Sequence, residues 1–228
     1  MNIKVIASGS SGNCYLISDD KTSLLLDAGI SFKQIQIGTN FNISNISGCF
    51  VTHRHIDHAK SIKDLNKRGV SIFGPKDVAE IYPIKIIKPF IKLKIGTFEI
   101  VPFPLKHDVE CYGYQIMNKD NKLVYITDTA YAKYKFSNLT HIMIEANYDR
   151  NIIRNNTFND VVNGKLANRI ISSHMSLDTV KEFLSENDLN KVQQIYLLHL
   201  SDNNSDTVLF KDAIQRQTGA EVYVFLWK

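Results

Sequence analysis

The sequence has little cysteine and no long apolar run. Only 3 of its 228 residues are cysteine, an odd number spread far apart, which excludes a disulfide framework and a cysteine-based zinc site. We expect Cys14, Cys49 and Cys111, each in an apolar strand-like context, to be buried free thiols. No stretch approaches the ~20 apolar residues of a membrane-spanning helix, and no signal-peptide pattern follows Met1. These absences predict a cytoplasmic protein without a membrane partner, in the host cytoplasm if a phage encodes it.

The chain also has little excess of positive over negative charge. The chain carries 27 Lys and Arg against 23 Asp and Glu, a net charge of +4, without a dense basic stripe. That excludes a protein that coats duplex nucleic acid, but it permits an anionic substrate. A hydrophobic fraction of 44% with 22% charged residues is ordinary globular composition. Because no repeat, low-complexity tract or linker interrupts the chain, we predict a single domain over residues 1–228.

Strand-like runs dominate the first half, and helices alternate with strands afterwards. A helical pattern starts at Asp57 and is closed by Gly69. Two more helices are predicted at 177–185, with Ser176 as N-cap, and at 206–217. Hairpins followed by interleaved helices predict an α+β class with two sheets covered by helices. The predicted strands are 3–7, 14–18, 23–27, 49–52, 91–95, 98–103, 112–117, 123–127, 141–145, 194–198 and 221–226.

The run His53-Arg54-His55-Ile56-Asp57-His58 carries the chemical signal. His53 and His55 are two apart at a strand end, so their imidazoles point to the same side and can reach one metal ion. Asp57 and His58 fall where a helix begins and can face a second ion. Imidazole with carboxylate is a ligand set for zinc, manganese or iron and not for calcium. A chance cluster of surface histidines is the alternative, and this spacing arises by chance in under ~10⁻³ of such chains.

More ligand-type residues follow at later strand ends, in the order His107, Asp128, His199. With the motif and the preceding Leu25-Leu26-Asp27-Ala28-Gly29, this order resembles the metallo-β-lactamase fold superfamily over the whole chain. The resemblance implies an αββα sandwich, two central sheets flanked by helices. It also implies two divalent metal ions, zinc ahead of manganese. In that family pattern the first metal is held by His53, His55 and His107, the second by Asp57, His58 and His199, and Asp128 bridges them.

Asp128 stands where zinc β-lactamases typically carry cysteine, and an oxygen bridge suits phosphate-ester chemistry. Four further segments resemble the YycJ/WalJ branch, which neighbours tRNase Z, and the phage anti-Pycsar phosphodiesterases, which destroy cyclic CMP and cyclic UMP. Tyr148 departs from the histidine expected in the bacterial members, which loosens a nuclease assignment but leaves the metal site. The four segments are the loop 8–13, Glu145-Ala146-Asn147, Ser173-His174-Met175-Ser176 and residues 199–204.

Several residues keep two interpretations. The loop 8–13 is either a plain hairpin turn or a set of backbone N–H groups that, with Asn13, lines the opening of the metal site. His174 is either a surface residue or, as the tRNase Z resemblance implies, a group that acts on the scissile phosphate. His141 is expected to be structural. Three tyrosines are either core residues or, if exposed, stack on a base: Tyr112, Tyr114 and Tyr131.

We predict two-metal phosphodiester hydrolysis. Asp57 or Asp128 orients the attacking hydroxide and takes its proton, and His174 neutralises charge or protonates the leaving oxygen. Glu145 or Asp27 fixes the ligand imidazoles.

A small cyclic nucleotide is the preferred substrate, because the weak charge offers few contacts for a polymer. The alternative is a DNA or RNA nuclease of the YycJ/tRNase Z kind. A third hypothesis is a catalytically inactive protein with the same fold that acts as a binding partner. The tRNase Z resemblance implies a homodimer.

Overall fold

A computed structural model describes residues 1–225. The chain divides into two compact units, described here separately. Unit 1 comprises Met1–Pro104 and Val109–Asn121, and unit 2 comprises Leu105–Asp108 and residues 122–225. Residue 226, where the last predicted strand ends, lies outside the described residues. Within residues 1–225, no helix has the length and apolar character needed to cross a lipid bilayer.

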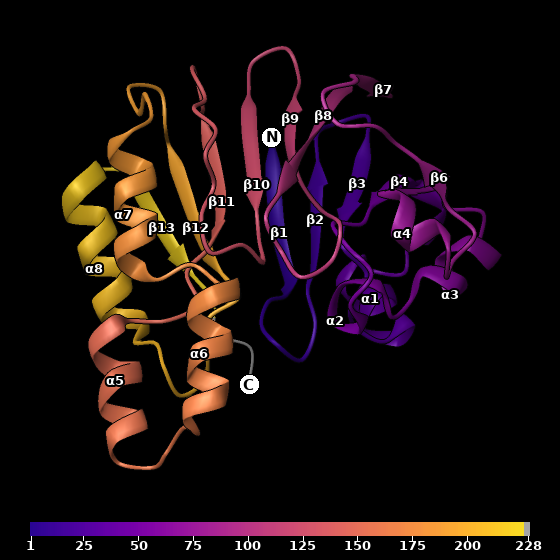
Figure 1. Ribbon diagram of the computed structural model, residues 1–228. Coiled ribbons are helices and arrows are strands. Elements are labelled where there is room, and N and C mark those ends of the chain that lie inside the picture. Colours follow the sequence, from indigo (N-terminus) through magenta and orange to yellow (C-terminus); the bar gives the residue numbers. More distant parts are fainter. Residues whose placement is uncertain (226–228) are drawn as a thin grey trace. The chain divides into compact units, whose positions relative to one another are not determined.

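Unit 1 contains a sheet whose strands follow chain order, β1 to β6 (Figure 1). The first three strands pair antiparallel, and β3 to β6 pair parallel. The strands are β1 (Asn2–Ala7), β2 (Cys14–Ser18), β3 (Ser23–Leu26), β4 (Ile46–Phe50), β5 (Ile72–Gly74) and β6 (Lys85–Ile86). The helices between them are α1 (Phe32–Gly38), α2 (Ile56–Ala59), α3 (Ile62–Lys67), α4 (Lys76–Ala79) and the 3-10 turn η1 (Ile43–Asn45).

Strands of a second sheet pack on the first within unit 1. They are β7 (Leu93–Ile95), β8 (Phe98–Leu105) and β9 (Cys111–Met117). The ring of Phe50 on β4 meets that of Tyr114 on β9 edge-on at 5.6 Å. The Tyr114 hydroxyl donates to the Val51 carbonyl at 2.6 Å, so the residues just before the histidine motif are fixed from both sheets. All three cysteines are buried free thiols, as predicted.

Unit 2 contains four parallel strands with helices between them. The strands β10 (Lys122–Ile126), β11 (His141–Glu145), β12 (Gln194–Leu198) and β13 (Glu221–Val224) pair in chain order. The helices are α5 (Arg150–Phe158), α6 (Gly164–Ser173), α7 (Leu177–Ser185) and α8 (Thr207–Thr218). Because parallel strands end at one edge of a sheet, their carboxyl ends bring together side chains from distant parts of the chain. Asp128, Glu145 and His199 lie at that edge.

The predicted α+β class, with two sheets and helices, is confirmed. The strands 14–18, 141–145 and 194–198 and the helix 177–185 match residue for residue, and Ser176 caps α7 by accepting from the Thr179 N–H. The continuous helix expected from Asp57 to Gly69 is wrong, since it breaks into α2 and α3. At the break, Ser61 donates its N–H to the Ala28 carbonyl and its hydroxyl to the Ile30 carbonyl. These are tertiary hydrogen bonds that no local pattern reveals.

Candidate metal centre

In unit 1, the loop after β4 places His53 and His55 side by side. The Nε2 atom of His53 lies 3.1 Å from Nδ1 of His55. Two nitrogens bound to one tetrahedral zinc ion, each at 2.0–2.1 Å, lie about 3.3 Å apart. This pair therefore has the spacing of two ligands of one metal ion.

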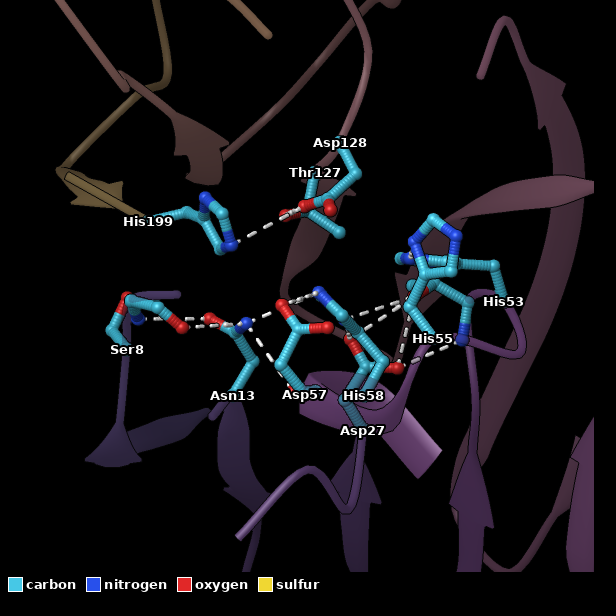
Figure 2. A network of polar contacts seen from close by, with 12 residues as sticks. Ser8, Asn13, Asp27, His53, His55, Asp57, His58, Thr127, Asp128 and His199 are labelled. Carbon is cyan, nitrogen blue, oxygen red and sulfur yellow. Dashed lines mark hydrogen bonds and ion pairs between the residues drawn. The ribbon is translucent and has the colours of Figure 1, made fainter. Parts of the chain in front are cut away.

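Asp57 and His58 lie together at the start of α2, whose N-cap is His55 (Figure 2). The Asp57 Oδ2 atom is 3.4 Å from Nε2 of His58. The other ring nitrogen of His58, Nδ1, is 2.8 Å from Oδ2 of Asp27, and both side chains are fully buried. Because the Asp27 carboxylate accepts from Nδ1–H, Nε2 is the nitrogen of a neutral His58 ring that carries the lone pair.

The Asp27 carboxylate also fixes the backbone that carries the histidines. Its Oδ1 accepts the N–H of Thr52 at 2.8 Å and the Thr52 hydroxyl at 3.0 Å. The same hydroxyl lies 3.0 Å from Nδ1 of His53. Asp27 stands directly after β3 with a φ of 57°, in the left-handed region. The predicted supporting role of Asp27 thus has a geometric basis, whereas the link through Thr52 was missed, although Thr52 directly precedes the motif.

The glycine-rich loop 8–13 is both a turn and a support for the site. Asn13 exchanges two hydrogen bonds of 3.1 Å with the backbone of Gly9, and its Nδ2 lies 3.1 Å from Nε2 of His58. Nearby, Gly29 packs against the backbone of α2. A Cβ atom at Gly29 would lie 1.6 Å from the Asp57 carbonyl oxygen, so only glycine lets this segment reach the ligand helix.

In unit 2, the Asp128 carboxylate faces two histidines with different oxygens. Oδ2 lies 3.9 Å from Nε2 of His107, and Oδ1 lies 3.7 Å from Nε2 of His199. Both distances exceed the 2.7–3.2 Å of an N–H···O hydrogen bond and are longer than the about 3.3 Å between two ligands of one tetrahedral zinc ion. The Nε2 atom of His107 lies closer, at 3.0 Å, to Oδ1 of Asp108. The side chains of Asp128, His107 and His199 are only 4% exposed. The arrangement fits the bridging role that the family resemblance implies for Asp128.

Asp128 and His199 both follow strand ends with a positive φ, 49° and 54°. The left-handed region is uncommon for residues other than glycine, although Asp, Asn and His enter it more readily than most. Strained backbone of this kind gathers at functional sites, and Asp27 in unit 1 shares it.

Behind Asp128 and His199 lies the fully buried carboxylate of Glu145. Its Oε1 hydrogen-bonds Nδ1 of His174 and lies 3.2 Å from Nδ1 of His199. The rings of His174 and His199 stack with centroids 5.2 Å apart. Burial lowers the pKa of His174, but the charge of Glu145 and its hydrogen bond outweigh burial, so the pKa lies above its ordinary value. His174 therefore lies beside His199, positioned by Glu145, and is not an isolated surface histidine.

Three other predictions concern residues around the site. Asn147, named at the sequence level without a role, donates from Nδ2 to the His199 carbonyl at 2.8 Å. Tyr114 is fully buried and Tyr112 is 4% exposed, so both are core residues, while Tyr131 is 54% exposed. His141 is buried with its Nδ1 at 2.8 Å from the Thr140 hydroxyl, as expected of a structural histidine.

The donor set in each unit fits divalent transition metals. In unit 2, ligand atoms of Asp128, Glu145, His174 and His199 all lie within 4.8 Å of one another. In each unit a buried acid, Asp27 or Glu145, supplies the outer hydrogen bond that a metal-bound histidine needs. The Sγ atom of Cys111 lies 3.8 Å from Nδ1 of His53, whereas Nε2 of that ring faces His55. The His and Asp clusters are consistent with a binuclear site built from nitrogen and oxygen ligands.

Comparisons with known proteins agree with this chemistry. Residues 22–199 match the family described as the beta-lactamase superfamily domain. The chain is 28% identical to the exodeoxyribonuclease YycJ of Bacillus anthracis over 235 aligned residues, which cover 90% of this chain and 84% of that protein. This relation confirms the predicted similarity to the YycJ/WalJ branch.

Solved structures show the same fold. The metallo-beta-lactamase fold protein YhfI from Bacillus subtilis superposes with a TM-score of 0.77 at 18% identity, covering 98% of this chain and 95% of that one. The short form of human tRNase Z superposes with a TM-score of 0.68 at 12% identity, covering 99% and 96%. The chain therefore belongs to the β-lactamase superfamily, with the metallo-β-lactamase fold, and is a metal-dependent hydrolase.

Proposed function

We propose that the protein is a metal-dependent nuclease that hydrolyses the phosphodiester bonds of DNA. The observation that carries this proposal is the similarity to an exodeoxyribonuclease over 90% of the chain. The all-oxygen-and-nitrogen donor set supports it, because Asp128 supplies a carboxylate whose two oxygens face different histidines. The proposal places DNA ahead of a cyclic mononucleotide, which the net charge favoured as the substrate.

Seven side chains are proposed to hold two divalent metal ions, zinc ahead of manganese. When bound, such ions supply Lewis acidity toward the phosphoryl oxygens and make water acidic enough to attack near neutral pH. The proposed ligands are His53, His55, Asp57, His58, His107, Asp128 and His199.

The chain's own catalytic groups are proposed to be Asp57, Asp128 and His174. A carboxylate of Asp57 or Asp128 orients the attacking water and accepts its proton. The Glu145 carboxylate holds Nδ1 of His174, so Nε2 is the ring nitrogen left to meet the phosphate. A protonated His174 neutralises charge that develops on the phosphoryl oxygens or gives its proton to the leaving oxygen.

The test compares substrate classes directly. Metal-loaded protein is incubated with end-labelled single-stranded and double-stranded DNA, RNA, cyclic CMP and cyclic UMP, at two salt concentrations. We expect DNA cleavage that weakens steeply with salt, because each phosphate contact releases counterions. Turnover of cyclic nucleotides with inert DNA contradicts the proposal and restores the resemblance to anti-Pycsar phosphodiesterases as the guide. His53→Ala, which removes a proposed ligand, is the inactive control.

A further inference from the structure

The helices α5 and α6 of unit 2 form a hairpin (Figure 1). A cavity lies between the two helices. The cavity has a volume of about 740 Å³, within the size range of small-molecule and cofactor pockets. Its floor includes the buried residues Tyr148 and Ile153. None of the residues proposed as metal ligands lines it, so the cavity is a feature separate from the metal centre.

Two matching stripes form its walls. On α5, the stripe consists of Arg150, Arg154 and Phe158, spaced four apart and thus on one face. On α6, the opposite wall is mostly small or apolar, with Gly164, Ala167 and Ile171, and Asn168 is its polar member. Successive residues of the α5 stripe are about 6 Å apart along the axis, at 1.5 Å per residue. One wall therefore offers two cations and an aromatic ring in a row.

The hairpin also exposes large apolar side chains. Phe158 is 87% exposed, and Val161, Leu166 and Ile171 are each about half exposed or more. Exposed apolar groups gathered on one element mark an interaction surface. The hairpin as a whole is basic, since residues 150–173 contain four basic residues and one acid, a net of +3 in a chain of +4. A second copy of this hairpin would bring like charges together, which disfavours a symmetric contact, whereas an anionic polymer complements the surface.

Two chain segments that line the cavity continue into residues of the proposed active site. Helix α6 ends at His174, its C-cap, whose N–H bonds the Ile170 carbonyl. The cavity-lining Ile171 lies in the last turn of the same helix. On the floor, Tyr148 directly follows Asn147, which bonds His199. Cavity and active-site residues of unit 2 are thus neighbours along two segments of the chain.

We propose that the groove between α5 and α6 binds a single-stranded nucleic acid, with Arg150 and Arg154 at phosphates and Phe158 stacked on a base. A cationic row next to an aromatic side chain is how proteins hold single strands without reading their sequence. Arg150 forms an ion pair with Asp178 at 3.5 Å. A substitution of Arg150 would also break that pair, so Arg154 is the residue chosen for the test. This inference rests on the proposed nuclease function, because it names the substrate form that reaches the same site.

The test measures binding without cleavage. Fluorescence anisotropy follows metal-loaded protein with a labelled, cleavage-resistant phosphorothioate strand of DNA, with the matching RNA strand and with a duplex. Arg154→Glu should weaken single-strand binding at least tenfold. The slope of log affinity against log salt concentration should become shallower by roughly one, the value for one lost phosphate contact. Phe158→Ala should weaken it roughly 10- to 100-fold, the effect of a lost base–aromatic stack, with the salt slope unchanged.

Matched controls come from α8. Lys211 and Val208 are exposed there, so Lys211→Glu makes the same charge reversal and Val208→Ala removes a comparable exposed apolar group. Both controls should bind within twofold of the unaltered protein. Wild-type affinity in both groove variants overturns the inference, and so does equal weakening by the controls. Stronger binding of duplex than of single strands also overturns it.

Two further outcomes are distinguishable. If Phe158→Ala leaves nucleic-acid binding intact but converts a dimer to a monomer in size-exclusion chromatography, the surface is an interface between copies and the inference is wrong. The homodimer implied by the tRNase Z resemblance is tested in the same measurement. If the unaltered protein fails to cleave both DNA and bis(p-nitrophenyl) phosphate, the proposed nuclease function fails, whatever the groove variants bind.

Discussion

The imidazole of His174 is held by the carboxylate of Glu145. Glu145 is fully buried, and its Oε1 hydrogen-bonds Nδ1 of a ring whose side chain is 17% exposed. Burial raises the pKa of Glu145, but the charge and hydrogen bond of His174 and the hydrogen bond of His199 lower it more, to below its ordinary value. An ionised carboxylate only accepts hydrogen bonds, so Nδ1 carries a proton and the orientation of the ring is fixed.

Replacing His174 should separate catalysis from metal binding. We expect His174→Ala to lower turnover by roughly 10²–10⁴, the usual contribution of a general acid or a charge-stabilising group, while both metal ions remain bound. Turnover is measured on DNA, and metal content by elemental analysis. A variant at the only histidine outside the site, His141→Gln, is the matched control and should retain turnover. Loss of metal in His174→Ala, or unchanged turnover, contradicts the role.

Replacing Glu145 should affect both neighbours. Glu145→Gln keeps the size of the side chain but removes the charge that orients His174 and His199. We expect metal affinity to fall roughly 10- to 100-fold, as for other residues that orient metal-bound histidines, and turnover to fall further than in metal-saturated His174→Ala. Competition with a chromogenic chelator gives the affinity. Unaltered affinity would show that Glu145 does not orient His199.

A variant at Asp27 should weaken the metal site from unit 1. Asp27→Asn removes the buried carboxylate that binds Nδ1 of His58 and the Thr52 N–H. Metal affinity should fall roughly 10- to 100-fold, and excess metal should restore much of the turnover. The exposed Asp20→Asn, next to a surface turn, is the control. If Asp27→Asn binds metal as the unaltered protein does, the proposed support is absent.

Metal removal should abolish activity and lower stability. Dialysis against a chelator should yield inactive protein, and added zinc or manganese should restore turnover at two ions per chain. The melting temperature should rise on metal addition, because an ion that binds the folded state stabilises it by mass action. Isothermal titration and elemental analysis measure the stoichiometry. One ion per chain, or sulfur ligands in X-ray absorption spectra, would refute the proposed ligand set.

The buried His141 should make folding stability depend on pH. Burial lowers its pKa from 6.5 to about 4, so between these values the unfolded chain binds a proton that the folded chain does not. The free energy of unfolding should therefore fall as the pH drops from 6.5 to 4, by up to about 3 kcal/mol from this residue. Urea unfolding of metal-free protein at pH 7 and pH 4.5 measures this. His141→Gln should show a smaller loss, and an equal loss would exclude His141 as the cause.

Local sequence determined much of the fold because strands and capped helices depend on nearest neighbours. The matches at β2, β11, β12 and α7 follow apolar runs bounded by turn residues or by an N-cap. By contrast, α5 and α6 were not predicted at all, because their exposed apolar side chains and many asparagines give no clear buried stripe. The split between α2 and α3 was also hidden, since hydrogen bonds from Ser61 to distant carbonyls cause it.

By itself, the sequence determined which residues are proposed as ligands and in what order, because the motif from His53 to His58 is a local pattern whose spacing suits metal binding. Only tertiary structure decided how those ligands are supported. Asp27 reaches His58 across 31 residues, and Glu145 reaches His174 across 29, where no periodicity links the partners. The physical reason is that strand ends meet at one edge of a sheet, so contacts there depend on strand order and backbone conformation, which composition and spacing do not encode.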